Sequence, residues 1–102
     1  MKISDFFKNI DKCLFCNNIL YSYSYCSKLN HFCTKNYFQI DYHDDDEYEM
    51  WCIVDDNNEI SIYKNGNILY LEPVNNNFEN VNELVAYMEA TFKKVVDNLL
   101  FI

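Results

Sequence analysis

The sequence predicts an α+β protein in which a four- to five-stranded antiparallel meander packs one face against a C-terminal amphipathic helix. Short alternating segments joined by short polar turns predict the strands, and apolar residues at helical spacing near the C-terminus predict the helix. A length of 102 residues suits one domain. We therefore expect a single domain, 1–102, with a cysteine-rich segment (1–36), a β-meander (37–72) and a helix (80–102).

The first segment is expected to hold a short helix, a tight turn and a strand. Ile3–Ile10 has room for one or two helical turns, and Ser4 is a candidate N-cap. Cys13–Asn18 is typical of a tight turn. Ile19–Tyr25 then alternates tyrosine and serine, which is the period-two pattern of a strand.

The middle segment predicts four strands with one apolar face each. Asn65-Gly66 is a strong hairpin signal, because a type I′ turn needs a positive φ at both central residues. Short connections favour antiparallel neighbours, and Pro73 is expected to end the sheet. The side chains expected to face the core are Phe38, Ile40, Tyr42, Met50, Cys52, Val54, Ile60, Ile62, Leu69 and Leu71.

The last segment predicts a helix that begins at about Val81. Asn80 is a suitable N-cap, and Glu83 stands three residues later, as in a capping box. The stripe expected to cover the inner face of the sheet comprises Leu84, Val85, Met88, Phe92, Val95, Val96, Leu99 and Leu100.

Four of the five cysteines lie in the first segment, in a pattern typical of a structural zinc site. Cys13-x2-Cys16 is followed by Cys26, and one of His31 or Cys33 supplies a fourth ligand. The compact x4 spacing after Cys26 favours His31, in which case Cys33 is a small core residue. The alternatives are buried thiols without metal and a thioredoxin-like redox pair. A closed set of four ligands leaves no position for water or substrate, so the zinc would be structural.

This layout resembles small uncharacterised phage proteins from low-GC hosts. The resemblance covers the whole chain: a Cys-x2-Cys turn, a tyrosine-rich strand, Cys-x4-His-Phe, a meander and an apolar C-terminal helix. The first half also resembles a zinc ribbon, although it lacks a second Cys-x2-Cys and has Asn17 where glycine is common. The resemblance implies no activity.

The charge distribution disfavours nucleic acid as a partner. The net charge is −8. Residues 1–36 contain five lysines and two acidic residues, whereas residues 37–102 contain three lysines and fourteen acidic residues. Such an acidic surface repels phosphate, and the chain has no arginine to grip it. We also find neither a secretory signal nor an apolar run of membrane-spanning length, so we expect a cytoplasmic protein.

No catalytic constellation is legible in the sequence, and we expect a protein without enzymatic activity. Cys52 falls on a core-facing strand position, which argues against a thiol nucleophile paired with His43. Asp44-Asp45-Asp46-Glu47 lacks the spacing and glycine of a calcium loop, so we interpret it as a solvated hairpin tip.

A non-enzymatic protein-interaction module is the function that this pattern favours. Tyr37, Trp51, Tyr63 and Tyr70, with Ile53 and Ile68, fall opposite the core positions, where one helix cannot cover them. This outer sheet face could bind another protein or a second copy of the chain. One alternative is a thiol-redox protein. Another is a nucleic-acid mimic that inhibits a host protein through Asp41, Asp44, Asp45, Asp46, Glu47, Glu49, Asp55, Asp56 and Glu59.

Overall fold

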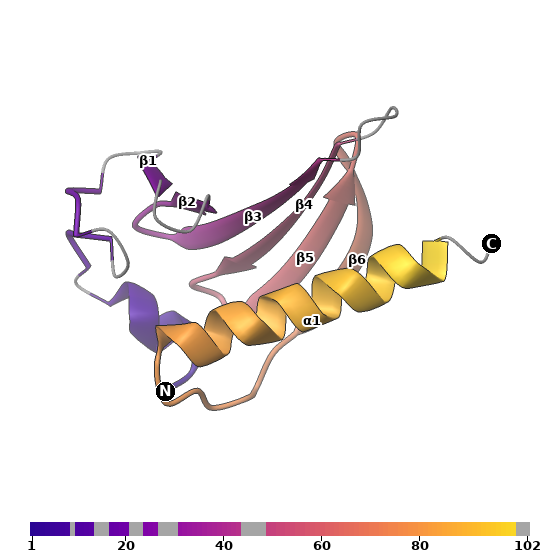
Figure 1. Ribbon diagram of the computed structural model, residues 1–102. Coiled ribbons are helices and arrows are strands. Elements are labelled where there is room, and N and C mark those ends of the chain that lie inside the picture. The colour runs from indigo at the N-terminus through magenta and orange to yellow at the C-terminus, as the bar shows by residue number, and fades with distance from the viewer. Residues whose placement is uncertain (9, 14–16, 21–23, 27–30, 44–48, 100–102) are drawn as a thin grey trace.

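A six-stranded antiparallel sheet and a C-terminal helix make up most of the fold, which a computed structural model presents (Figure 1). The structure describes residues 1–8, 10–13, 17–20, 24–26, 31–43 and 49–99, and of residues 24–26, 31, 42, 43 and 99 it describes the backbone alone. A 3₁₀ helix, η1, spans Ile3–Phe7, and the helix α1 spans Val81–Leu99. The strands are β1 (Ser24–Cys26), β2 (His31–Cys33), β3 (Tyr37–His43), β4 (Glu49–Asp55), β5 (Glu59–Lys64) and β6 (Asn67–Pro73).

The strands lie in the order β1 to β6, so each described strand pairs with its neighbours in the chain. The expected α+β layout is confirmed, with α1 packed on the sheet. The sheet has more strands than the four to five expected. The reason is that the short β1–β2 hairpin joins β3 by pairing Cys33 with Phe38 and His31 with Ile40.

The turns of the meander follow from local side-chain chemistry. Asn65 and Gly66 both have positive φ, of 50° and 83°, as a type I′ turn requires. Between β4 and β5, Asp55 Oδ1 accepts hydrogen bonds from the backbone N–H of Asn57 and Glu59, at 2.9 and 3.2 Å. Residues 44–48, which include the acidic tip expected between β3 and β4, lie outside the described residues.

One extra residue in β6 changes the face of the sheet to which the later side chains of that strand point. The hairpin pairs Tyr63 with Ile68, and an unbroken register would then pair Ile62 with Leu69. Instead a bulge pairs Ile62 with Tyr70, so the following side chains change faces. The expectation that Leu69 and Leu71 are core residues is therefore wrong, and both are exposed. Pro73 ends the strand as expected.

The helix α1 begins where the sequence predicts it. Asn80 Oδ1 accepts a hydrogen bond from the backbone N–H of Glu83 at 3.0 Å, which is an N-cap. Glu83 does not complete the box on Asn80; its carboxylate accepts from the backbone N–H of Glu79 at 2.7 Å. Leu84, Met88 and Phe92 are buried on the sheet, whereas Leu100 lies outside the described residues.

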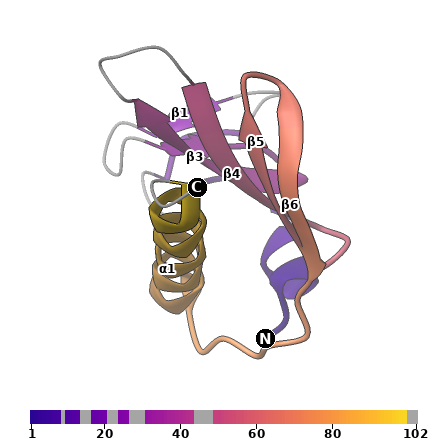
Figure 2. The same cartoon turned by 90° about the vertical axis from the view of Figure 1, so that its right-hand side faces the viewer.

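Two segments cover the inner face of the sheet. Figure 2 shows α1 and η1 on the same side of the strands. The rings of Phe7 in η1 and Phe38 in β3 are 4.7 Å apart. Ser4 does not cap η1 as expected; Asp5 instead accepts a hydrogen bond from the Lys2 backbone N–H at 2.8 Å. The core also contains, among the described residues, Ile3, Phe6, Cys13, Leu20, Cys33, Ile40, Met50, Cys52, Val54, Ile60, Ile62, Val74 and Phe78.

A two-way backbone bridge ties the N-terminus to the segment before α1. Phe78 N–H donates to the Met1 carbonyl, and the Met1 amino group donates to the Phe78 carbonyl, both at 2.6 Å. In the described part of the chain, no helix combines the length and apolarity that crossing a membrane requires.

Candidate functional site

A tight turn presents Cys13, the first of the expected metal ligands. The Cys13 carbonyl accepts a hydrogen bond from Asn17 N–H at 3.0 Å, and Cys13 N–H donates to the Asn18 carbonyl at 2.8 Å. Asn17 has a φ of 61°, the left-handed conformation that glycine adopts at least cost and that asparagine tolerates. Asn17 thus takes the conformation for which a zinc ribbon often uses glycine. Cys16 lies outside the described residues.

The chain brings Cys33 to Cys13 from the opposite end of the cysteine-rich segment. Cys13 Sγ donates a hydrogen bond to Cys33 Sγ over 3.3 Å. Both residues are buried, with 3% and 1% of their surface exposed. The sulfurs of a disulfide are about 2.05 Å apart, so Cys13 and Cys33 do not form a disulfide here. The contact joins two residues 20 positions apart.

The other expected ligands are placed by backbone register. Cys26 of β1 pairs with His31 of β2, and Ser24 pairs with Cys33. Alternation along the strands therefore puts positions 24, 26, 31 and 33 on one face of the sheet. Among the described residues, no group of three or more His, Cys, Asp or Glu side chains is arranged to hold a metal ion. The described part of the expected site is thus the Cys13–Cys33 pair.

A hydrogen-bonded turn follows Cys33. The next residue, Thr34, is buried, and its Oγ1 accepts from the backbone N–H of Asn36 and Tyr37 at 3.1 and 3.0 Å. Thr34 N–H also donates to the Tyr37 carbonyl at 3.0 Å. This turn directs the chain from β2 into β3 and holds Cys33 opposite Phe38. This turn was not predicted from the sequence, although threonine is a turn-forming residue that could have indicated it.

Cys52 lies apart from this pair in the middle of the sheet. It pairs with Ile40 on one side and Ile62 on the other, and none of its surface is exposed. Burial raises the pKa of its thiol to about 12, because the low-dielectric core disfavours the thiolate. The thiolate is the reactive form of cysteine. Cys52 is therefore poorly suited to act as a nucleophile.

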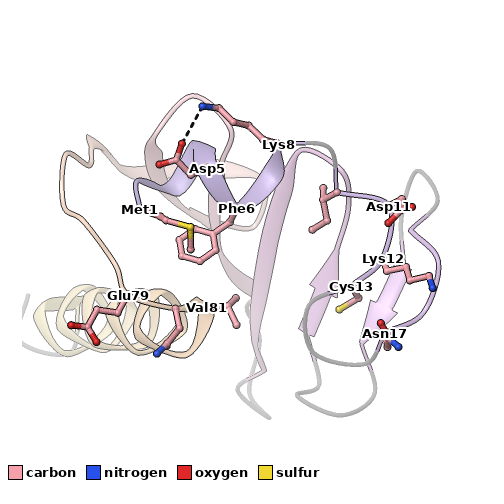
Figure 3. A pocket seen from close by; sticks show the side chains of 12 residues that line it. Met1, Asp5, Phe6, Lys8, Asp11, Lys12, Cys13, Asn17, Glu79 and Val81 are labelled. Carbon is pink, nitrogen blue, oxygen red and sulfur yellow. Dashed lines mark ion pairs between the residues drawn. The ribbon is translucent and has the colours of Figure 1, made fainter.

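A pocket of about 640 Å³ opens beside Cys13. It lies between η1, the Cys13 turn and the start of α1, and Figure 3 shows the side chains around it. Asp5 and Lys8 form an ion pair of 3.2 Å on its rim, and Asp11 and Lys12 approach from the other side. Cys13 belongs to the lining of this pocket, whereas Cys33 does not.

The second candidate site is the outer face of the sheet, opposite α1. Trp51 and Tyr63 are paired across β4 and β5, and their rings stack with centroids 5.5 Å apart and an interplanar angle of 15°. Ile68 and Leu71 extend this surface onto β6 and are 55% and 57% exposed. We use the name outer face for the apolar residues Phe32, Tyr37, Trp51, Ile53, Tyr63, Ile68 and Leu71.

Of the tyrosines expected on the outer face, Tyr37 lies there and Tyr70 does not. Tyr37 is half-buried, and desolvation raises the pKa of its hydroxyl. Tyr70 pairs with Ile62 and packs against the core, because the bulge in β6 turns it to the inner side. Its hydroxyl donates to the Glu72 carboxylate. The bulge has no signature in the sequence, so neither this change nor the outward position of Leu71 could be foreseen.

Acidic side chains surround the outer face. Asp41 pairs with Trp51, and Asp55 pairs with Tyr37. The outer positions of β3, β4 and β5 carry four acids and, among described residues, no lysine; the acids are Asp41, Glu49, Asp55 and Glu59. The other acids expected to act with them, Asp44 to Glu47, lie outside the described residues.

Comparison with known protein families, with curated protein sequences and with solved structures gives no match to this chain.

Proposed function

We propose that this protein is a small, non-enzymatic interaction module that binds another protein through the outer face and is stabilised by zinc in its cysteine-rich segment. One observation carries the proposal: α1 and η1 lie on one side of the sheet (Figure 2), whereas Trp51 and Tyr63 stack on the opposite face, over which no described helix packs. Trp51 and Tyr63 are half-buried, and the exposed side chains of Ile68 and Leu71 continue this apolar surface. Exposed apolar patches mark interaction sites. Tryptophan and tyrosine also contribute most often to binding energy at interfaces.

The charges around the outer face indicate the chemistry of the partner. Asp41 and Asp55 stand beside the aromatic residues, and the whole chain carries a net charge of −8. A partner with an apolar centre and a basic rim would complement this surface. A second copy of the chain would place acidic rims against each other, so we favour a different protein over a homo-oligomer.

Zinc is the cofactor that the cysteine-rich segment supports best. We propose Cys13, Cys16 and Cys26 as ligands, with His31 or Cys33 as the fourth. The support is the Cys13 turn with its left-handed Asn17 and the 3.3 Å approach of two buried sulfurs. A structural zinc ion adds folding free energy where the core is small.

The cell compartment follows from the same proposal. We place the protein in the cytoplasm, or in the host cytoplasm if a phage encodes it, because cysteines remain reduced and available to metal there. The partner would then be a cytoplasmic protein, and nucleic acid and membranes are not proposed as partners.

The test is capture of a partner from a lysate of the source cell by the intact, immobilised protein. We expect one specific partner that wild type retains and that the double variant Trp51→Ala, Tyr63→Ala loses. The matched control is Asn98→Ala, an exposed substitution on α1, which should capture as wild type does. Equal capture by wild type and the double variant would overturn the proposal. So would a dimer of the protein itself that the double variant abolishes in sedimentation velocity.

A nucleic-acid mimic is the second candidate, and one observation favours it. Four described acidic residues lie on one face of the sheet, namely Asp41, Glu49, Asp55 and Glu59. Binding by mimicry would weaken steeply with salt and would be lost in the double variant Asp41→Asn, Asp55→Asn. Binding by the aromatic residues would weaken little with salt and would instead require Trp51.

A thiol-redox function is the third candidate, because Cys13 and Cys33 lie close enough to form a disulfide after a small movement. It predicts that a small-molecule disulfide oxidises wild type to an internal Cys13–Cys33 disulfide with release of two small thiols, whereas Cys33→Ser releases one thiol and stops at a mixed disulfide. A zinc-loaded protein that resists such exchange would speak against it.

A further inference from the structure

We propose that Cys13 and Cys33 bind the same thiophilic metal ion and that His31 is not a ligand. The inference rests on the proposed zinc staple and deepens it, because it decides between two ligand sets that the sequence leaves open. It also reverses the preference for His31 that the x4 spacing suggests.

The distance between the two sulfurs is the first argument. Two thiolates at about 2.3 Å from a tetrahedral zinc ion lie roughly 3.8 Å apart. Cys13 Sγ and Cys33 Sγ are separated by 3.3 Å. An increase of about half an ångström in the Sγ–Sγ distance therefore gives the separation expected for two ligands of one zinc ion.

The backbone on both sides of the pair is the second argument. Cys13 is fixed by its two hydrogen bonds to Asn17 and Asn18, and Cys33 by the Thr34 turn and by its place in β2. Ligands held in position before the ion arrives lose little conformational freedom when it binds. The pocket reaches one member of the pair, Cys13.

The number of sulfurs is the third argument. A structural zinc ion takes four ligands, and thiolates are ligands that it prefers. The sequence already supplies two more cysteines in the same segment, at positions 16 and 26. With Cys33 in the set, four sulfurs complete the ion, and no position remains for His31.

The experiment uses the intact protein and compares three single variants. We expect His31→Asn to bind one zinc ion as tightly as wild type in native mass spectrometry and chelator competition. Cys33→Ser should lose more affinity than the roughly 10- to 100-fold that loss of an outer hydrogen-bond partner of a ligand causes. Cys52→Ser is the matched control, because Cys52 is also a buried strand cysteine, and its zinc affinity should equal that of wild type.

A measurement on wild type keeps the inference testable if Cys33→Ser fails to fold. Co²⁺ replaces Zn²⁺ in thiolate sites, and its visible absorption bands distinguish four sulfur ligands from three sulfurs and one nitrogen. We expect the four-sulfur spectrum, unchanged in His31→Asn. A three-sulfur, one-nitrogen spectrum that His31→Asn alters would overturn the inference and leave the zinc staple standing.

The inference and the proposed function fail in different ways. If wild type binds neither Zn²⁺ nor Co²⁺, the zinc staple and the inference both fall, but the outer face is unaffected. If metal binds through Cys33 and the partner is still captured without Trp51 and Tyr63, the inference holds and the proposed contact surface is wrong.

Discussion

Burial alters the chemistry of the Cys52 thiol. Folding raises the pKa of its thiol from 9.0 to about 12, so the folded state favours the protonated form. The stabilisation that this thiol gives is complete below about pH 8.5–9, where it is protonated in both states. It is lost as the pH rises from there through about 12.

We therefore expect wild type to lose free energy of unfolding relative to Cys52→Ala between pH 9 and pH 12. The expected difference grows by about 1.4 kcal/mol per pH unit in this range. Urea unfolding of both proteins at pH 8 and pH 10.5 measures it. Tyrosine and lysine ionisation cancels in the comparison, and parallel curves for the two proteins would show that Cys52 is not desolvated.

The left-handed conformation of Asn17, with a φ of 61°, is tolerated by few residue types and leads to a second prediction. Asn17→Val should lower the free energy of unfolding by roughly 1–2 kcal/mol, since a β-branched residue is strained there. Asn17→Gly should change it little. Asn18→Val is the control, because Asn18 is equally exposed but does not share the positive φ. Chemical denaturation of the three variants and wild type under the same conditions gives the values, and equal effects at both positions would contradict the assignment.

The residues of the candidate site could be predicted from sequence only in part. The spacing of Cys13 and Cys16 identifies a turn, because that relation is local. The approach of Cys33 to Cys13 could not be predicted, since it depends on how the β1–β2 hairpin lies against the turn. Tyr70 was expected on the outer face, and this expectation was wrong because a bulge that no residue type indicates moves it to the inner side.

The N-cap of α1 is a prediction at the scale of an element. Asn80→Ala removes the side-chain acceptor of Glu83 N–H and should lower the free energy of unfolding by about 1 kcal/mol. Asn82→Ala, an exposed change two residues later, should be neutral or slightly stabilising, because alanine favours the helix interior. Urea unfolding followed by circular dichroism measures both, and an equal loss in the two variants would argue against the cap.

Elements with a strong local signal were predicted closely. The boundaries of α1 and of the β5–β6 hairpin follow from Asn80 and from Asn65-Gly66, whose side chains and backbone freedom act within a few residues. Pairing of β2 with β3 depends instead on distant partners and on a turn made by one threonine hydroxyl. Periodicity alone contains no information about such partners, so the number of strands was underestimated.

If the proposed zinc ion is bound, two parts of the molecule should respond differently to its removal. Met50, Ile60, Leu84 and Met88 form a packed centre without sulfur ligands, whereas β1 is a strand of three residues paired only with β2 among the described strands. We expect that a strong chelator speeds hydrogen exchange of the β1 and β2 amides by at least tenfold. The amides of β4, β5 and α1 should remain protected.

Hydrogen exchange with mass spectrometry makes this comparison, with Cys52→Ser as a control that should respond as wild type does. Exchange that the chelator leaves unchanged in β1 and β2 would show that zinc does not stabilise this hairpin. Global unfolding would show that the meander and α1 cannot fold without it.

The order of the strands has a consequence for how the chain reaches this structure. Every described strand lies beside the one that precedes it, so each pairing closes a short loop and the mean sequence separation of contacts is low. Hairpins can therefore form one after another while the chain leaves the ribosome, before α1 has been synthesised. The bridge between Met1 and Phe78, 77 positions apart, must wait until the sheet is complete. Until α1 docks, the growing sheet exposes apolar side chains on both faces, and that interval is when aggregation is the greatest risk.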